Sequence, residues 1–582
     1  MSDSMKWNLE SMYENDDLLA KDIDETKASL SVIGDLSKDP KNNIKEILDL
    51  YEKISRKINH MYSYGHMRKD EDSRVSKYQK FNMELMSLYT DFETGFAFLR
   101  PFLLGLGEAE FEEIKNREDL SRFKLTLDKI FRYKPHTLTE NEEKIITSLQ
   151  PVSQAPSDIY YYLTNADMQF PKLESTCEKL SQATFVKLQN SPDREVRKEA
   201  FEKFYTTFNG FANTIATSYY SNLKAITTEA KLRGYDSARQ MELFRDDVDI
   251  KVYDALIESI HENMPSIHKY YEIKKRALGL EEQHMYDVYM PITSSFDKQY
   301  SFEEARDLCI ASVAPLGEEY QDIYRSAFTD RWMDVLPREG KRGGAYSSGS
   351  YDSNPFILLN FNGTLDSVFT MAHEMGHSMH SYYAKENNEY LDHSYTIFAA
   401  EVASTFNETL LLNYLMDRVE TEAEKLYLID FYVDSFKSTV FRQTMFAEFE
   451  RETHKLVEEG KGLTWEDFSS IYLGLNEEYF GDSMVSDQLI GYEWMRIPHF
   501  YSDFYVYKYA TGYTASTILA YRVLNGKDGA LENYFKFLKD GSKHFPIEQL
   551  KMAGVDMSDP NTVGEALKVF KDNVDKLDRL VK

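Results

Sequence analysis

Cysteine is scarce in this chain of 582 residues, which contains only Cys177 and Cys309. The two residues lie far apart and are not spaced like metal ligands, so the sequence argues against both a disulfide framework and a thiolate metal site. A chain that does not depend on disulfides fits a reducing compartment, and we expect a cytoplasmic protein.

Long apolar runs are also missing. No uninterrupted run reaches the roughly 18 apolar residues that a membrane-spanning helix needs. Residues 1–16 lack the basic region followed by an apolar stretch that is typical of a secretory signal. The sequence therefore predicts a soluble protein with no membrane partner.

Positive charge is in short supply, because 68 lysine and arginine residues stand against 97 aspartate and glutamate residues, for a formal net charge of −29 at pH 7. Such a charge repels phosphate backbones and argues against nucleic acid as a partner. Cationic or neutral ligands fit better. What the chain does have, 42% hydrophobic and 14% aromatic residues, is typical of a folded globular protein.

Helical periodicity dominates the chain. In residues 40–150 and 175–285, apolar side chains recur at three- and four-residue spacing between charged ones, which is the period of a helix. A chain of this length exceeds the size at which one hydrophobic core stops growing. We therefore expect a mainly α protein with more than one lobe.

Two segments interrupt the helical pattern. "SLQPVSQAPSD" (148–158) contains two prolines, and "NSPDREVRKEAF" (190–201) is typical of a loop followed by an N-capped helix. We place a domain boundary near residue 190, between an N-terminal helical lobe (1–190) and a second domain (191–582).

One short strand is predicted within "RGGAYSSGSYDSNPFILLNFNG" (342–363). A loop rich in glycine and serine leads there into the apolar run 356–361, which is bounded by Pro355 and Gly363. We expect residues 356–361 to form this strand.

The stretch "FTMAHEMGHSMHSYY" (369–383) carries the most specific chemical signal. Residues four apart on a helix are neighbours on one face, so His373 and His377 can bind one ion. Zinc takes nitrogen and oxygen ligands, and catalytic zinc leaves one position to water. Glu374 lies about 100° round the helix from His373, beside the metal, where it can act as a general base.

An alternative interpretation is that these histidines only satisfy polar groups on a buried helix. Val368, Ala372, Met375 and Met379 would bury the helix in any case. Gly376 argues against this alternative, because glycine in mid-helix costs about 1 kcal/mol relative to alanine. Such a cost is expected where another element or a ligand approaches the backbone, and we predict close packing there.

The third ligand must come from elsewhere in the chain. In residues 394–415 the periodicity is again helical, and Glu401 and Glu408 face the same side. We predict Glu401 as the third ligand and Glu408 as a carboxylate that orients one of the histidines. A solvated Glu408 is the alternative. His380 and His393 compete as ligands, and we favour a supporting or structural role for both.

These residues resemble the oligoendopeptidase F branch of the thimet oligopeptidase family of zinc peptidases. The core of the resemblance is the 369–383 stretch followed by "FAAEVASTFNE" (398–408). Downstream, "RIPHFYSDFYVYKYATG" (496–512) is similar to a C-terminal signature of the family. The residues that correspond to the family's metal ligands are His373, His377 and Glu401, and Glu374 corresponds to its catalytic glutamate.

The resemblance covers nearly the whole chain and implies a mainly α, two-lobed, clam-like metallopeptidase. It implies a deep central channel and a small β element next to a site for one Zn²⁺, with residues 191–582 as the catalytic zinc peptidase domain. Such a channel admits short unstructured peptides and excludes folded proteins. We expect a monomer or a small homo-oligomer.

The resemblance also implies catalytic residues near the C-terminal signature. His499 matches a histidine that helps to bind substrate and to stabilise the oxyanion. We choose Tyr505 and Tyr509 as its tyrosine partners, because residues four apart lie on one helical face. Core packing of these rings is the alternative.

An extended peptide is expected to pair with the strand at 356–361 by strand addition. The "GGAY" segment (343–346) before it is either a mobile loop over the cleft or a purely structural turn. The candidate substrate-binding residues are therefore Gly344, Ala345, Tyr346, Phe356, Leu358 and Asn360.

Together these predictions describe a zinc-dependent endopeptidase that hydrolyses internal peptide bonds of short unstructured oligopeptides, by Glu374-assisted attack of a zinc-bound water. The alternatives are a carboxypeptidase or dipeptidyl carboxypeptidase on a similar fold, and a general proteinase. From another class, the alternative is a non-catalytic helical peptide-binding protein.

Overall fold

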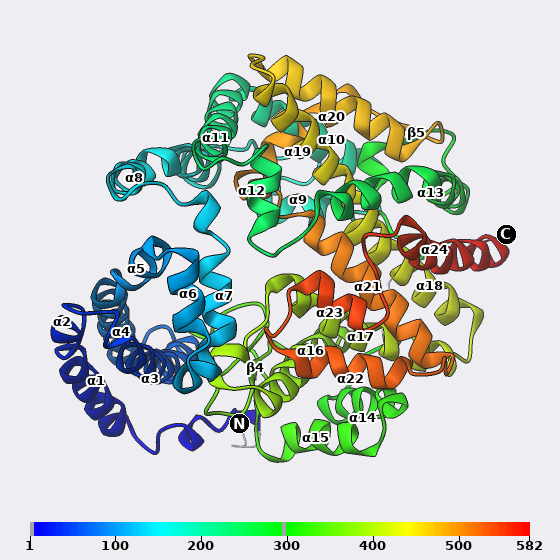
Figure 1. Cartoon of the computed structure of the whole chain (residues 1–582). Coiled ribbons are helices and arrows are strands. Elements are labelled where there is room, and N and C mark those ends of the chain that lie inside the picture. The colour runs from blue at the N-terminus through cyan, green and yellow to red at the C-terminus, as the bar shows by residue number, and fades with distance from the viewer. Residues whose placement is uncertain (1–4, 294–297, 582) are drawn as a thin grey trace. The chain divides into compact units, whose positions relative to one another are not determined.

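The computed structural model describes residues 5–293 and 298–581, and helices dominate it, as the periodicity predicts (Figure 1). The mainly α fold class is confirmed. Over the described part of the chain, no helix combines the length and the apolarity that crossing a bilayer requires.

The chain divides into two compact units, each assembled from three separate segments. The first unit comprises Met1–Glu140, Asp297–Tyr414 and Leu519–Gly554, and the second comprises Asn141–Phe296, Leu415–Ile518 and Val555–Lys582. The domain boundary near residue 190 follows chain order instead, and it stays a prediction.

The first unit starts with a run of helices. These are α1 (Asp16–Leu30), α2 (Ile33–Leu36), α3 (Ile44–Glu71), α4 (Ser76–Phe96), α5 (Leu99–Gly105), α6 (Glu108–Lys115) and α7 (Lys124–Phe131). Its later segments contribute α14 (Phe302–Ser312), α15 (Glu318–Thr329), β2 (Met333–Asp334), β3 (Tyr346–Ser348), β4 (Phe356–Leu358), α16 (Leu365–Asn387), α17 (Ile397–Met416), α22 (Ala530–Asp540) and α23 (Pro546–Met552).

Capping and an apolar stripe explain the first of these helices. Helix α1 begins where the side chain of Asn15 accepts hydrogen bonds from the backbone N–H groups of Asp17 and Leu18, donors that a helix leaves free at its start. Along α3, buried apolar residues such as Ile47 and Ile54 recur at helical spacing and pack with α1 and α4. The helical pattern of the sequence thus becomes one core.

A three-stranded sheet in the order β2-β4-β3 adjoins this core. The central strand β4 is parallel to β2 and antiparallel to β3. The strand predicted at 356–361 exists, but only Phe356–Leu358 form it. The expectation that a peptide pairs with it is wrong, because both of its edges are already paired. Phe356 and Leu358 are fully buried in the core, so they are not available to bind substrate.

The second unit contains α8 (Glu140–Tyr162), α9 (Gln182–Gln189), α10 (Arg194–Asn209), α11 (Ala212–Leu232), α12 (Ala238–Phe244), α13 (Ile250–Ala277) and β1 (Gln283–His284). It also contains α18 (Glu422–Phe436), α19 (Arg442–Glu458), α20 (Trp465–Phe480), β5 (Met484–Val485), α21 (Tyr507–Leu524), which runs on into the first unit, and α24 (Pro560–Leu580).

Helix α8 corrects one prediction. The prolines of residues 148–158 were expected to interrupt the helical pattern, yet Pro151 and Pro156 both lie inside the helix. Proline in a helix interior costs roughly 3 kcal/mol, so packing must offset the loss. Pro156 is buried, and its carbonyl accepts a hydrogen bond of 2.6 Å from the hydroxyl of Ser218 in α11.

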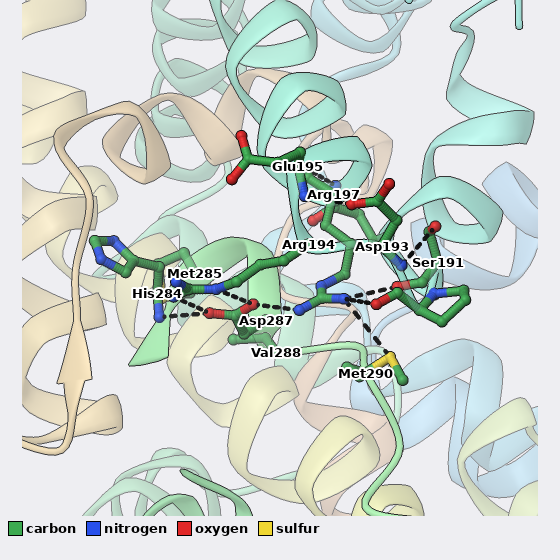
Figure 2. A network of polar contacts seen from close by, with 12 residues as sticks. Ser191, Asp193, Arg194, Glu195, Arg197, His284, Met285, Asp287, Val288 and Met290 are labelled. Carbon is green, nitrogen blue, oxygen red and sulfur yellow. Dashed lines mark hydrogen bonds and ion pairs between the residues drawn. The ribbon is translucent and has the colours of Figure 1, made fainter. Parts of the chain in front are cut away.

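Helix α10 begins as the sequence predicts. The side chain of Asp193 accepts a hydrogen bond from the backbone N–H of Glu195, which confirms the N-capped start expected within residues 190–201. Figure 2 shows a second anchor for this first turn, the buried carboxylate of Asp287.

Asp287 links α10 to the chain that follows β1. Its oxygens lie 3.0 Å from Arg194 and 2.7 Å from Arg197 (Figure 2). The same carboxylate accepts a hydrogen bond of 3.0 Å from the backbone N–H of His284. A buried charge that is both paired and hydrogen-bonded in this way fixes the geometry of the elements that carry it.

Candidate metal centre

Two helices of the first unit, α16 and α17, carry the candidate centre. They approach closely at Gly376, where a Cβ atom would lie 2.5 Å from the Cα of Ser404 and 2.6 Å from the carbonyl oxygen of Ala403. Both neighbours are backbone atoms, so only glycine fits without a shift of a helix. The close packing predicted at Gly376 is confirmed.

This packing brings the predicted metal ligands together. Ligand atoms of His373, His377 and Glu401 all lie within 4.8 Å of one another. His373 Nε2 is 3.7 Å from Glu401 Oε2, and the two imidazole centroids are 4.8 Å apart. Two imidazole nitrogens and one carboxylate oxygen are a donor set that zinc and related divalent metals accept. The three residues therefore fit a metal ion.

Glu408 lies behind the first of these ligands. Its Oε1 is 2.5 Å from Nδ1 of His373, so the other nitrogen of that ring is the one nearer Glu401. Burial would lower the pKa of His373, but the hydrogen bond and charge of Glu408 raise it to about 9. Burial and the neighbouring His373 lower the pKa of His377 to about 3. The contact expected of Glu408 is present, and its role toward a metal stays a prediction.

Glu374 lies on the same helix as the two histidines and is only 7% exposed. Burial raises the pKa of its carboxyl to about 7, with the charge of His373 opposing and that of Glu401 adding to the shift. The backbone N–H of Ser347 in β3 donates a hydrogen bond to it. A carboxyl group with a pKa near neutrality can both accept and release a proton at physiological pH.

The competing histidines lie outside this ligand group. His380 is fully buried and stacks on Tyr395, with ring centroids 3.7 Å apart. Nδ1 of His393 is hydrogen-bonded to the carbonyl of Tyr390. Both histidines thus have structural contacts of their own, in line with the structural role that the sequence favours.

Most of the remaining substrate-binding candidates lie at the start of β3. Gly344 has φ +80°, a conformation that favours glycine, and its carbonyl accepts a hydrogen bond of 2.7 Å from Asn360. Half-buried Ala345 follows it. The hydroxyl of Tyr346 donates a hydrogen bond of 3.0 Å to Asp70 of α3. These bonds favour the structural turn over the mobile loop.

The predicted oxyanion residues lie in the second unit and form a cluster of rings. His499 stacks parallel to Tyr505 with centroids 6.2 Å apart, and Tyr509 meets both rings edge-on at 6.1 and 5.4 Å. The prediction that the two tyrosines share one helical face is wrong, because α21 begins only at Tyr507. Two turns leading into α21 bring Tyr505 beside Tyr509: the N–H of Lys508 donates to the carbonyl of Tyr505, and the N–H of Tyr509 donates to that of Val506.

Family models decide what kind of protein carries this site. Residues 187–569 match the model of peptidase family M3, and residues 103–170 match that of oligopeptidase F. The chain belongs to peptidase family M3. As a member of this family it is a metallo-endopeptidase, as the sequence predicts.

Similar members of the family match over the whole length. Oligopeptidase PepF of Bacillus subtilis is 38% identical across 99% of this chain and 87% of its own length. The crystal structure of oligoendopeptidase-F from Enterococcus faecium is 31% identical and covers 97% of this chain and 99% of its own, with a TM-score of 0.75. A protein from Chlamydophila abortus, provisionally classed as a peptidase, is 34% identical over 100% of this chain and 99% of its own, with a TM-score of 0.94. The resemblance to the oligoendopeptidase F branch of M3 is confirmed.

Sequence reasoning missed the backbone groups around this M3 site. The carbonyl of Ala400 accepts a hydrogen bond from His377, and the N–H of Ser347 donates one to Glu374. Nearly every residue has such groups, so no residue type signals them. Strand β3, with three residues, is also too short to show alternation.

Proposed function

We propose that the protein is a zinc-dependent endopeptidase that hydrolyses internal bonds of short unstructured oligopeptides. The observation that carries this proposal is the convergence of His373, His377 and Glu401, with Glu374 beside them, in a chain of family M3. Relatives named oligopeptidase or oligoendopeptidase, 36 to 38% identical over nearly the whole chain, support the substrate class.

His373, His377 and Glu401 are the residues that would hold the metal. Zinc is the proposed ion because it favours this donor set in hydrolytic enzymes. When bound, it would supply a Lewis acid that acidifies water and polarises a carbonyl group. Glu408 contributes by accepting the Nδ1–H of His373, which keeps the Nε2 lone pair free for coordination.

Glu374 is the proposed proton carrier. Its carboxylate accepts a proton from the attacking water and later gives it to the departing amine. Burial favours the protonated form of this carboxyl, which helps it to take up the proton. Hydrolysis then needs no covalent intermediate with the enzyme.

Strand β3 is the proposed docking edge for the substrate. It lies at the edge of the β2-β4-β3 sheet, and its central residue, Ser347, donates to Glu374. An extended peptide added along this edge would bring its backbone alongside the general base. Main-chain hydrogen bonds hold many sequences, so we expect a broad preference. Gly344, Ala345, Tyr346 and Asn360 would shape the start of this edge.

His499, Tyr505 and Tyr509 are the proposed hydrogen-bond donors to the tetrahedral oxyanion. Their mutual ring contacts support a common role. One donor of this kind is typically worth about 3 kcal/mol in the transition state.

For the compartment we propose the cytoplasm, since Cys177 and Cys309 are both free thiols.

Replacing Glu374 by glutamine tests the mechanism. Glu374→Gln removes the proton acceptor and keeps the shape of the side chain, so we expect kcat to fall by about 10²- to 10⁴-fold while metal content stays at the wild-type level. Hydrolysis of an internally quenched peptide and elemental analysis measure the two quantities. Glu386→Gln, at an exposed position of the same helix, is the matched control. Unchanged turnover in Glu374→Gln would contradict the proposal.

Peptides blocked at both ends separate the endopeptidase from the exopeptidase alternatives. We expect an acetylated and amidated peptide to be cut internally, whereas a carboxypeptidase or dipeptidyl carboxypeptidase would leave it intact. A chelator should stop the reaction and added zinc should restore it. If folded proteins were cut as readily as the peptide, the oligopeptide class would be wrong.

A further inference from the structure

The turn between His499 and α21 contains one strained residue. Phe504 has φ +54°, in the left-handed region that a bulky side chain rarely adopts. Its ring is buried, with centroids 4.4 Å from His454 and 5.8 Å from Tyr253. A residue keeps such a conformation only where its surroundings impose it, and strain of this kind gathers at functional sites.

Glu450 of α19 makes a long-range polar contact to this residue, in addition to the local hydrogen bond from the N–H of Tyr505 to the carbonyl of Ser502. Its Oε1 accepts a hydrogen bond of 2.8 Å from the backbone N–H of Phe504. The side chain is fully buried, and burial raises the pKa of the carboxyl well above its usual range. The backbone N–H of Phe504 is thus a hydrogen-bond partner for a buried acid. Burying an acid is costly without such a partner.

Side chains on either side of Phe504 point in different directions. Phe504, Val506 and Tyr507 are buried, whereas Tyr505 is half-buried and His499 is exposed. The left-handed residue sends its own ring inward and leaves the next side chain free to lie parallel to His499. The placement of His499 relative to the two tyrosines therefore depends on the backbone at Phe504.

We propose that Glu450 is a positioning residue, which acts through Phe504 to set how His499 lies relative to Tyr505 and Tyr509. It lies in the interior and is hydrogen-bonded to the backbone, so it is not itself a catalytic residue. Its effect on turnover rests on the oxyanion role proposed above for the three rings. Its effect on the arrangement of the rings does not depend on that oxyanion role.

Two substitutions of Glu450 separate its hydrogen bond from its bulk. Glu450→Leu replaces the hydrogen-bond acceptor by an apolar side chain of similar size. Glu450→Gln keeps a side-chain carbonyl oxygen that can still accept the bond. We measure turnover per folded, metal-loaded molecule and the imidazole NMR signal of His499. For Glu450→Leu we expect kcat and kcat/KM to fall together by about tenfold, with KM unchanged and the signal shifted. Glu450→Gln should retain most of the turnover and the original signal.

Glu448→Leu is the matched control. Glu448 is another buried acid of α19, hydrogen-bonded to His261 at 2.7 Å and to Tyr479 at 3.0 Å. Its loss removes a buried carboxyl group from the same helix but not from the turn. We expect lower stability, with turnover per folded molecule and the His499 signal both unchanged.

The two readouts distinguish the outcomes. If Glu450→Leu shifts the His499 signal without changing turnover, the positioning is supported and the oxyanion role is contradicted. If neither changes, the positioning is overturned.

Should Glu450→Leu fail to fold, Phe504→Gly and Phe504→Ala replace it. Both lack the ring, but only glycine adopts φ +54° without strain. We expect turnover by Phe504→Gly to be about threefold faster than turnover by Phe504→Ala. Equal rates for these two variants would overturn the proposal.

Discussion

The carboxylate of Glu408 contacts Nδ1 of His373, and this contact leaves Nε2 of the same ring facing Glu401. Replacing Glu408 by alanine removes the acceptor at 2.5 Å, so the ring can rotate and change its tautomer. We expect Glu408→Ala to lower metal affinity by about 10- to 100-fold, measured by competition with a chromophoric chelator. Glu386→Ala on α16 is the control. Equal affinities would contradict the orienting role of Glu408.

At the same scale, the sequence predicts side chains better than it predicts the backbone. The helical period places His373 and His377 on one face of a helix and Glu401 and Glu408 on one face of another, and the family resemblance links the two helices. Phe504 could not be predicted in this way, since nothing in its residue type indicates a left-handed backbone. Its backbone N–H bonds to Glu450 of α19, a long-range contact that no local pattern contains.

Helices α16 and α17 pass each other at the one position that has no side chain. A methyl group at Gly376 would lie 2.5 Å from the Cα of Ser404, so one helix must move. We expect Gly376→Ala to lower the free energy of unfolding by about 1–3 kcal/mol and to weaken metal binding, because Glu401 moves with α17. Urea denaturation and the chelator competition measure the two effects.

A glycine without close neighbours provides the control for that substitution. Gly474 lies inside α20, and a Cβ there would meet nothing within 4 Å. Gly474→Ala should therefore stabilise the protein by about 0.5–1 kcal/mol. If Gly376→Ala were equally harmless, the contact between α16 and α17 would not be as tight as described.

Elements differ in how well local sequence predicts them. Long amphipathic helices such as α3 follow from their period, and a capped start such as that of α10 follows from Asp193. The prolines of α8 suggest a break in the helix that does not occur. The contact of Pro156 with Ser218, which lies far away in the sequence, cannot be seen in a local stretch of residues. Strands of two or three residues, such as β2 and β3, are too short for a periodic signal, so only the more apolar β4 was expected.

The stability of the whole molecule should depend on pH through Glu493. Its oxygens lie 2.6 Å from Arg442 and 3.0 Å from Arg496. Burial would raise the pKa of this carboxyl, but the two guanidinium groups lower it to about 2. An unfolded glutamate titrates near pH 4.3. The pairing therefore stabilises the fold above about pH 4.3, and this contribution is lost as the pH falls toward 2.

Urea denaturation of Glu493→Gln at two pH values checks this linkage. We expect the variant to be less stable than the wild type by about 3 kcal/mol at pH 7, and the difference to shrink at pH 3. Glu466→Gln, at an exposed position of α20, should show little change at either pH. A difference that does not vary with pH would contradict the assignment to the charge of Glu493.

The division into two units was beyond the reach of the sequence. Periodicity describes neighbours along the chain, whereas each unit joins segments that are separated in the sequence by segments of the other unit. The first unit needs residues 519–554 and the second needs residues 555–582. No single cut in the chain would separate two intact units.

A ribosome makes this polypeptide in chain order, so the first unit cannot close until residues 519–554 have left the exit tunnel, and the second cannot close until residues 555–582 have followed. For most of its synthesis the nascent chain presents apolar faces whose partners have not yet been translated. That is the condition under which chaperones are recruited and aggregation competes with folding. Slow release of these C-terminal segments would therefore delay the first unit and then the second.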